Sequence, residues 1–267
     1  MTNTSKELTA RIRKLLDRLV ESRRLGNDDK EVEHDEVTGE ARELPRNGIL
    51  KALDQAIGRS KSRREAAVYL LSEWTDVPEV VDRIGEWIND PNPEWRNWLL
   101  QIIAREGLTR FAPHLSQIIE DDQDEFCRDM AIHAAGKLRA NECLPALLRL
   151  ADQNDPKLTW RLATALQSYA TEECRPSLKK WFDDASLDKS TRIFAARGLG
   201  KLGDQAAMDY LIGMLDDPDE RGENYSRPGQ SLRAAQALCD IRGWPFEWDK
   251  SSVAKTKERV LASNNEV

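Results

Sequence analysis

The stretch Thr191-Arg-Ile-Phe-Ala-Ala-Arg-Gly-Leu-Gly-Lys-Leu-Gly-Asp204 carries the pattern on which the fold of this chain depends. An arginine precedes alanine and leucine at helical spacing, and glycine and aspartate close the segment. Five further copies occur in the 267 residues, marked by arginines at spacings of 33, 32, 33, 31 and 41: Arg63, Arg96, Arg128, Arg161, Arg192 and Arg233. In the fourth and sixth copies the arginine is displaced by two positions against the Ala/Leu pattern, and residues 219–229 lengthen the last interval. A steady period of this length indicates a stack of repeats.

Each repeat contains two amphipathic helices. Residues 78–89 place Val80, Val81, Ile84 and Ile88 at helical spacing, and the turn Asp90-Pro-Asn-Pro93 ends that run before a second helix begins. Later turns are also rich in Asp and Asn, which cap free N–H groups at a helix start. No segment alternates with a period of two, so the sequence predicts an all-α fold: an α-solenoid, a right-handed superhelix of about six hairpins.

The arginine, followed by Ala-Ala-x-x-Leu-Gly-x-Leu-Gly near an aspartate-rich turn, resembles the HEAT-repeat family. Its short bacterial form, similar to phycobilisome-lyase repeats, comes nearest, and the resemblance covers residues 48–243. It implies that the second helices of the repeats line an inner, concave surface. Because function lives in sites grafted on folds, the resemblance identifies the fold and says little about the activity.

The chain divides into four segments. Residues 1–25 predict an N-terminal amphipathic helix, with Leu8, Ile12, Leu15, Leu16, Leu19 and Val20 on one side. Residues 26–44 hold eight Asp/Glu against two basic residues and predict a mobile acidic linker. Residues 45–243 form the repeat array. In residues 244–267, the cluster Trp244-Pro-Phe-Glu-Trp248 predicts a cap over the last apolar face, followed by a helix and a tail.

Composition narrows the functional classes. The net charge of −7 and the pI near 5.3 weigh against a surface that coats nucleic acid, although a local basic patch remains compatible with them. The longest uncharged apolar run, residues 98–104, is too short to span a bilayer, and the polar start favours a cytoplasmic protein without membrane contact. The four widely spaced cysteines, Cys127, Cys143, Cys174 and Cys239, are expected in the core rather than in disulfides or a zinc site.

No motif predicts catalysis, a cofactor or a metal. Gly198-Leu-Gly-Lys-Leu-Gly203 fits a dinucleotide fingerprint, but it ends a helix, whereas that fingerprint must lie between a strand and a helix start. The three histidines, His34, His114 and His133, form no metal-binding pair. The chain is therefore interpreted as a non-enzymatic scaffold.

Two features favour a binding surface. Eight tryptophans are unusual; Trp95 and Trp160 are expected in the core, and Trp98 at its edge is the better partner-binding candidate. Outward positions on the second helices carry five basic residues against one acidic: Arg64, Asn97, Gln101, Arg105, Asp129, His133, Lys137, Arg197 and Lys201. The predicted partner-binding residues on this basic groove are Arg64, Trp98, Arg105, Lys137, Arg197 and Lys201.

The leading hypothesis is recognition of a protein or peptide, acidic or phosphorylated, along this groove. Three alternatives stay open: nucleic-acid binding of the type seen in HEAT-like DNA-repair glycosylases, a tetrapyrrole lyase or chaperone, and an inhibitor or immunity-type partner of a toxic enzyme.

Overall fold

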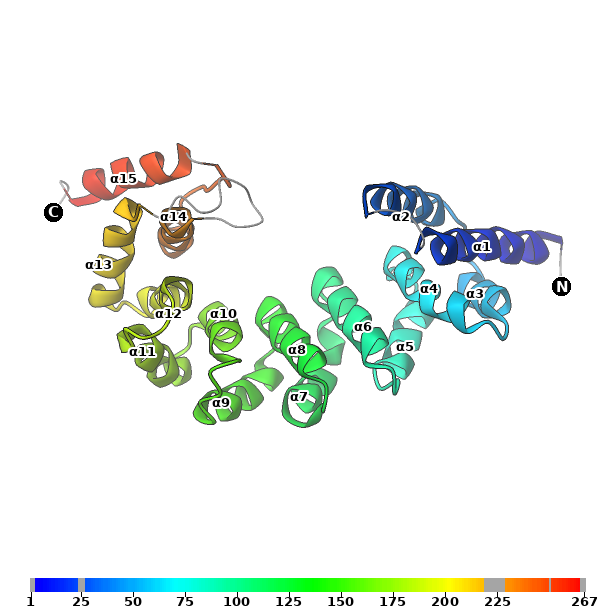
Figure 1. The fold of residues 1–267 in the computed structure, drawn as a ribbon, viewed down its shortest axis with the longest axis horizontal. Coiled ribbons are helices and arrows are strands. Elements are labelled where there is room, and N and C mark those ends of the chain that lie inside the picture. Colours follow the sequence, from blue (N-terminus) through cyan, green and yellow to red (C-terminus); the bar gives the residue numbers. More distant parts are fainter. Residues whose placement is uncertain (1–2, 24–26, 219–228, 250, 265–267) are drawn as a thin grey trace. The chain divides into compact units, whose positions relative to one another are not determined.

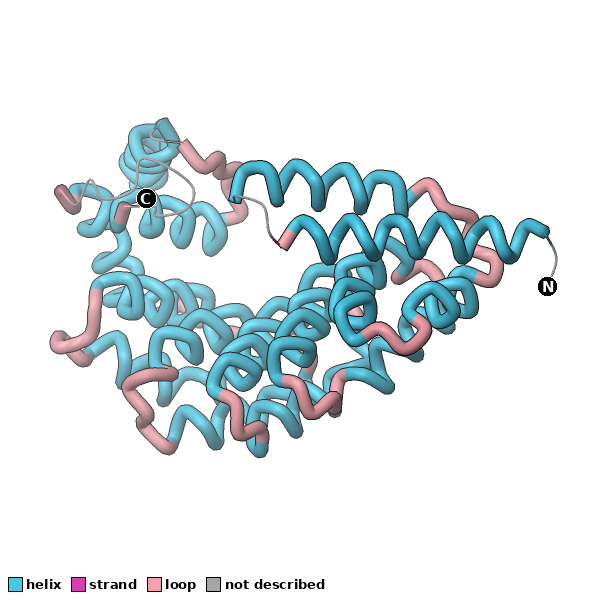
Figure 2. The backbone as a smooth tube through the Cα atoms, turned by 45° about the vertical axis from the view of Figure 1, so that its right-hand side comes forward, coloured by secondary structure: helices cyan, strands magenta, loops and turns pink. Residues whose placement is uncertain are grey.

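The computed structural model describes residues 3–23, 27–218, 229–249 and 251–264, and within them it contains helices and no strand. Short loops and single turns join consecutive helices (Figure 2). The prediction of an all-α fold of the solenoid type is confirmed. The lengthening predicted at residues 219–229 lies, except for Gly229, outside the described residues.

The chain separates into two compact units, residues 1–111 and residues 112–267. The first unit contains α1 (Asn3–Ser22), α2 (Asn27–Arg42), α3 (Ile49–Ile57), α4 (Lys61–Leu71), α5 (Pro78–Trp87) and α6 (Pro93–Glu106). The second contains α7 (Ala112–Asp121), α8 (Glu125–Leu138), α9 (Leu144–Asp152), α10 (Thr159–Tyr169), α11 (Arg175–Asp183), α12 (Lys189–Lys201), α13 (Gln205–Gly213), α14 (Gln230–Arg242) and α15 (Ser251–Asn264).

Six hairpins pair a first with a second helix, from α3 with α4 through α13 with α14. In the second unit the first helices α7, α9, α11 and α13 lie on one side and the second helices α8, α10, α12 and α14 on the other (Figure 1). Single 3-10 turns, such as Asn141–Cys143 before α9, prepare the start of several first helices.

The polar turns between helices supply the caps that the sequence predicts. The side chain of Asp124 accepts a hydrogen bond from the backbone N–H of Cys127 at 2.9 Å, and that of Asp188 accepts one from Thr191 at 3.0 Å. Each carboxylate satisfies an N–H that has no partner inside the helix and also lies at the positive end of the helix dipole. Aspartate therefore defines where α8 and α12 begin, whereas α10 and α14 begin without a side-chain cap.

Small residues let neighbouring second helices touch at the backbone. A Cβ placed on Gly136 of α8 would lie 2.8 Å from Cα and 3.0 Å from Cβ of Ala165 on α10. A Cβ on Gly198 of α12 would lie 2.7 Å from Leu178 and 3.1 Å from Cα of Gln167. No larger side chain fits these contacts without moving a helix. The continuous core of the second unit depends on them because one hairpin alone cannot cover its apolar side.

Exposed polar contacts join the first helices of successive repeats. In the first unit Arg83 on α5 binds Asp54 on α3, and Arg110 binds Asp82 on α5. In the second unit Arg149 on α9 donates to Glu120 on α7. The pairs span 29, 28 and 29 residues, close to one repeat each.

The predicted helix at residues 1–25 is confirmed as α1, whose Leu8, Ile12, Leu15, Leu16 and Leu19 are buried. The acidic linker predicted at 26–44 is wrong, because residues 27–42 form helix α2. Val37, Ala41 and Leu44 are fully or almost fully buried. The guanidinium of Arg18 on α1 forms ion pairs with the carboxylates of Glu33, Glu36 and Glu40 along α2. A cation outside residues 26–44 therefore balances part of the negative charge of that segment.

At the other end, helix α15 packs on α14, with Thr256 and Val260 buried and Thr256 in contact with the thiol of Cys239. The aromatic cluster predicted as a cap is only partly buried. Phe246 and Trp248 lie edge to face 5.1 Å apart, and Trp248 is exposed. Among the described residues, helix α15 therefore covers α14 on this side.

We expect Gly136→Ala to destabilise the second unit by about 1–3 kcal/mol, because overpacking against the backbone of Ala165 outweighs the gain in helix propensity. The free energy of unfolding in urea checks this. Gly213→Ala is the control, because its Cβ meets nothing within 4 Å. An equal effect of the two substitutions would contradict the close-contact argument.

We expect Arg18→Met to loosen α2, since the three glutamates lose their shared cation. Amide hydrogens of α2 should exchange roughly five-fold faster, as expected for the loss of about 1 kcal/mol from partly exposed ion pairs. Hydrogen exchange followed by mass spectrometry measures this. The control is Arg11→Met at an exposed position of α1, the helix that also carries Arg18, and it should leave the exchange of the α2 amides unchanged.

Candidate partner-binding surface

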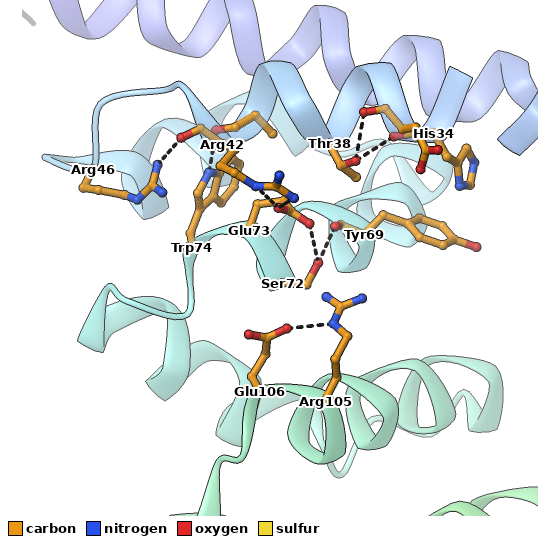
Figure 3. A network of polar contacts seen from close by, with 12 residues as sticks. His34, Thr38, Arg42, Arg46, Tyr69, Ser72, Glu73, Trp74, Arg105 and Glu106 are labelled. Carbon is orange, nitrogen blue, oxygen red and sulfur yellow. Dashed lines mark hydrogen bonds and ion pairs between the residues drawn. The ribbon is translucent and has the colours of Figure 1, made fainter. Parts of the chain in front are cut away.

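The second helices present the residues that the sequence singles out. In the first unit Arg64 of α4 is exposed, and its Nη2 donates to Asp90 at 2.8 Å. Its guanidinium also lies 4.5 Å from the ring centre of Trp95. Arg105 of α6 is exposed and donates to its neighbour Glu106 at 2.7 Å (Figure 3). Both cations therefore already have a carboxylate partner.

Trp98 lies half-buried on α6. Its ring centre is 4.9 Å from that of Tyr69 on α4, and Tyr69 is 4.9 Å from His34 on α2. Burial raises the pKa of the Tyr69 hydroxyl and lowers the pKa of His34, so both rings are uncharged near neutral pH. The three rings form a strip across α2, α4 and α6 of the first unit, and Trp98 is the end of that strip rather than an isolated anchor.

In the second unit Arg197 and Lys201 of α12 meet at one carboxylate. Arg197 Nη2 lies 2.8 Å and Lys201 Nζ 2.5 Å from Asp240 Oδ2 on α14. Burial raises the pKa of Asp240, but the hydrogen bonds and charges of Lys201 and Arg197 together lower it below its usual range. The carboxylate is thus held ionised. Lys137 on α8 is exposed and forms no ion pair among the described residues.

Of the six predicted residues, the structure brings only Arg197 and Lys201 to a common contact. Four of the five basic residues on the predicted face form ion pairs with acids that are not among the outward positions counted from the sequence. These four are Arg64, Arg105, Arg197 and Lys201. The acidic member of the face, Asp129, binds Arg161 through two hydrogen bonds of 2.6 Å. The excess of positive charge on these helices is therefore smaller than the sequence count indicates.

Sequence reasoning misplaced one tryptophan. Trp95 is 4% exposed, as expected of a core residue, but Trp160 is 38% exposed. In the fourth repeat Leu158 is buried in its place. The displacement of the arginine by two positions in this copy was the signal: it moves Trp160 from the apolar side of α10 to its outer side.

Trp160 belongs to a connected group across four second helices, which we call the Trp160 row: Asp129, Trp160, Arg161, Phe194 and Arg233. The guanidinium of Arg161 lies 4.6 Å from the Trp160 ring centre, and Trp160 meets Phe194 edge to face at 6.1 Å. Arg233 lies 5.7 Å from the ring centre of Phe194. Such cation–π contacts hold the rings in place while part of Trp160 stays open to solvent.

Arg233 differs from Arg161 in having no ion pair with an acid among the described residues. Its Nε is buried without a hydrogen-bond partner among the described residues. Burial lowers the pKa of the guanidinium, and the more distant charge of Asp188 opposes this. A guanidinium nevertheless stays charged at neutral pH. Arg233 is therefore a partly desolvated cation that lacks a carboxylate.

Metal-ligand groups, cysteines and glycine motifs were the candidate chemical features of the sequence. The described residues contain no group of three His, Cys, Asp or Glu side chains placed to hold a metal ion. All four cysteines are unbridged and buried, as expected, and burial raises the pKa of Cys143 to about 12, which keeps its thiol protonated. Gly198 and Gly200 pack against neighbouring side chains inside a helix instead of forming a phosphate-binding loop. None of the described helices has a stretch long and apolar enough to cross a membrane.

These successive helical hairpins define a helical-repeat protein. The sequence profile for HEAT repeats matches residues 48–136 and 144–223, more than half of the chain. The protein therefore belongs to the HEAT-repeat family. No curated protein matches it.

His133 on α8 makes the stability of the folded protein depend on pH. Burial and the charges of Arg161 and Lys137 lower its pKa, and only Asp129 opposes them. In the unfolded chain the histidine has a pKa of about 6.5 and binds a proton more readily than His133 does in the folded protein. The contribution of His133 to stability is therefore fully present above about pH 6.5 and is lost as the pH falls below this value.

We expect His133→Gln to reduce the loss of stability between pH 7.5 and pH 5.5, because Gln does not titrate. Urea unfolding midpoints of wild type and variant at both pH values measure this. An unchanged drop in the variant would show that His133 does not take part.

Proposed function

We propose that this protein is a non-enzymatic scaffold that recognises a protein or peptide partner through its second helices. The observation that carries the proposal is the exposure of large aromatic side chains on those helices. Phe126 at the start of α8 is 75% exposed and Trp160 at the start of α10 is 38% exposed. Exposed aromatic side chains beside arginine are typical of the centres of protein interfaces.

Charge supports a protein partner rather than nucleic acid. The chain carries a net charge of −7, and Arg64, Arg105 and Arg197 on its second helices already hold a carboxylate. Binding to a phosphate backbone requires several cations that are free to replace counterions. In the proposal, Trp98, Arg64 and Arg105 contribute in the first unit and Lys137, Arg197 and Lys201 in the second.

We also place the protein in the cytoplasm. Its four cysteines stay unbridged and buried, which is usual where thiols are kept reduced.

Site-specific photo-crosslinking tests the proposed face. Benzoylphenylalanine in place of Phe126 or Trp160 keeps an aromatic side chain at each position. In cells of the source organism we expect both positions to yield an adduct with the same protein, identified by mass spectrometry. The control position is Asp209, exposed on first helix α13, where no adduct is expected.

Two outcomes would contradict the proposal. An adduct formed only from Asp209 would place the partner on the first helices. An adduct at Trp160 that nuclease treatment removes would identify nucleic acid as the ligand.

A further inference from the structure

The second helices of the second unit keep a surplus of positive charge after their internal pairs are counted. Asp240 is the one carboxylate at which Arg197 and Lys201 meet, so the three groups together carry one net positive charge. Lys137 adds an exposed cation without an ion pair among the described residues. An anion that approaches this side is therefore attracted by the net charge of the Arg197–Lys201–Asp240 group and by Lys137.

Arg233 supplies a stronger attraction at one point. Its Nε is buried and makes no hydrogen bond among the described residues, and the guanidinium rests on the ring of Phe194. Water has already been removed from part of this cation in the folded protein. Because the low local dielectric strengthens a charged hydrogen bond, a carboxylate that reaches Arg233 gains more than it would at an exposed lysine.

An apolar anchor lies on the same ring. Trp160 on α10 packs edge to face against the ring of Phe194 on α12. Arg233 on α14 contacts the same Phe194 ring. Phe126 adds a second exposed ring on α8. A ligand bound across α10, α12 and α14 would therefore meet apolar surface and unpaired positive charge within neighbouring helices.

We propose that this face, built on Trp160, Phe194, Arg233 and the Arg197–Lys201 pair, binds an acidic peptide segment that carries an aromatic or aliphatic anchor. The anchor packs on Trp160, and carboxylates bind Arg233 and the Arg197–Lys201 pair. Asp240 occupies part of the position that the second carboxylate takes, so it lowers the affinity. The inference rests on the proposed function, because it names the partner of the same second-helix surface.

A peptide fits better than a nucleic acid here. The same helices present neutral Thr164 and Ser168 and the carboxylate of Asp129 beside their cations. A regular phosphate chain needs closely repeated cations, and Asp129, Thr164 and Ser168 interrupt the row of cations on these helices. An irregular acidic segment can place its few carboxylates where the cations lie.

The test uses a displayed library of random 12-residue peptides selected on the full-length protein. We expect enriched peptides rich in Asp and Glu with one aromatic or leucine residue. Fluorescence anisotropy then measures the labelled peptides on variants. Arg233→Met should weaken binding by roughly ten-fold or more, since a charged hydrogen bond is lost. Asp240→Asn should tighten binding by about three-fold, since a competing carboxylate is removed.

Matched controls lie on the first helices of the same unit. Asp209→Asn removes the same charge as Asp240→Asn, and Lys179→Met on α11 removes a cation as Arg233→Met does. Both should leave binding unchanged. The expected gain in Asp240→Asn cannot come from misfolding, so the proposal stays testable even if Arg233→Met proves unstable.

The outcomes separate the two levels of the hypothesis. Peptides that bind in a Trp160-dependent manner but lack acidic residues would overturn the acidic partner and leave the proposed binding face standing. Peptides insensitive to both Trp160→Ala and Arg233→Met would overturn both. A selection without enriched peptides, or an oligonucleotide of 20 nucleotides that binds more tightly and loses affinity in Arg233→Met, would overturn the acidic-peptide inference.

Discussion

In the second unit, neighbouring hairpins cover each other's apolar sides, and small residues set how closely they approach. At Gly136 and Ala165, α8 and α10 meet at the level of the backbone. Such contacts leave no freedom in how the helices are rotated, because any rotation brings a side chain into the gap. The outward positions of the second helices follow from this constraint. Trp160, Arg161 and Phe194 form a row because the helices beneath them cannot turn.

Periodicity was enough to predict the hairpins, the caps and the burial of the cysteines, since each of these depends on residues close in the sequence. Helix α2 shows where local reasoning fails. Its charge composition favoured a linker, yet Val37, Ala41 and Leu44 recur at helical spacing and are buried. The cation that joins its glutamates, Arg18, lies 15 to 22 residues away on α1. Composition counts charges within a segment and misses a partner outside it.

The candidate surface was predicted less completely for the same reason. Which helices carry it followed from the repeat pattern, and so did the positions of Arg197 and Lys201. Their shared partner Asp240 lies one repeat further along the chain, beyond the lengthened interval. Trp160 was misplaced because one copy is displaced by two positions, which rotates the residue out of the core. A surface built from several repeats depends on the register of every copy.

The two sides of the second unit are joined by contacts of different stiffness, and this has a mechanical consequence. Its first helices are linked by an exposed ion pair such as Arg149 with Glu120, which can lengthen and which salt screens. Its second helices α8 and α10 approach at the level of the backbone at Gly136, where no side chain lies between them that could give way. When the second unit bends, the distances between its first helices therefore change more than the distances between its second helices. The spacing between side chains on neighbouring second helices is therefore preserved during such motion, while the first helices move apart.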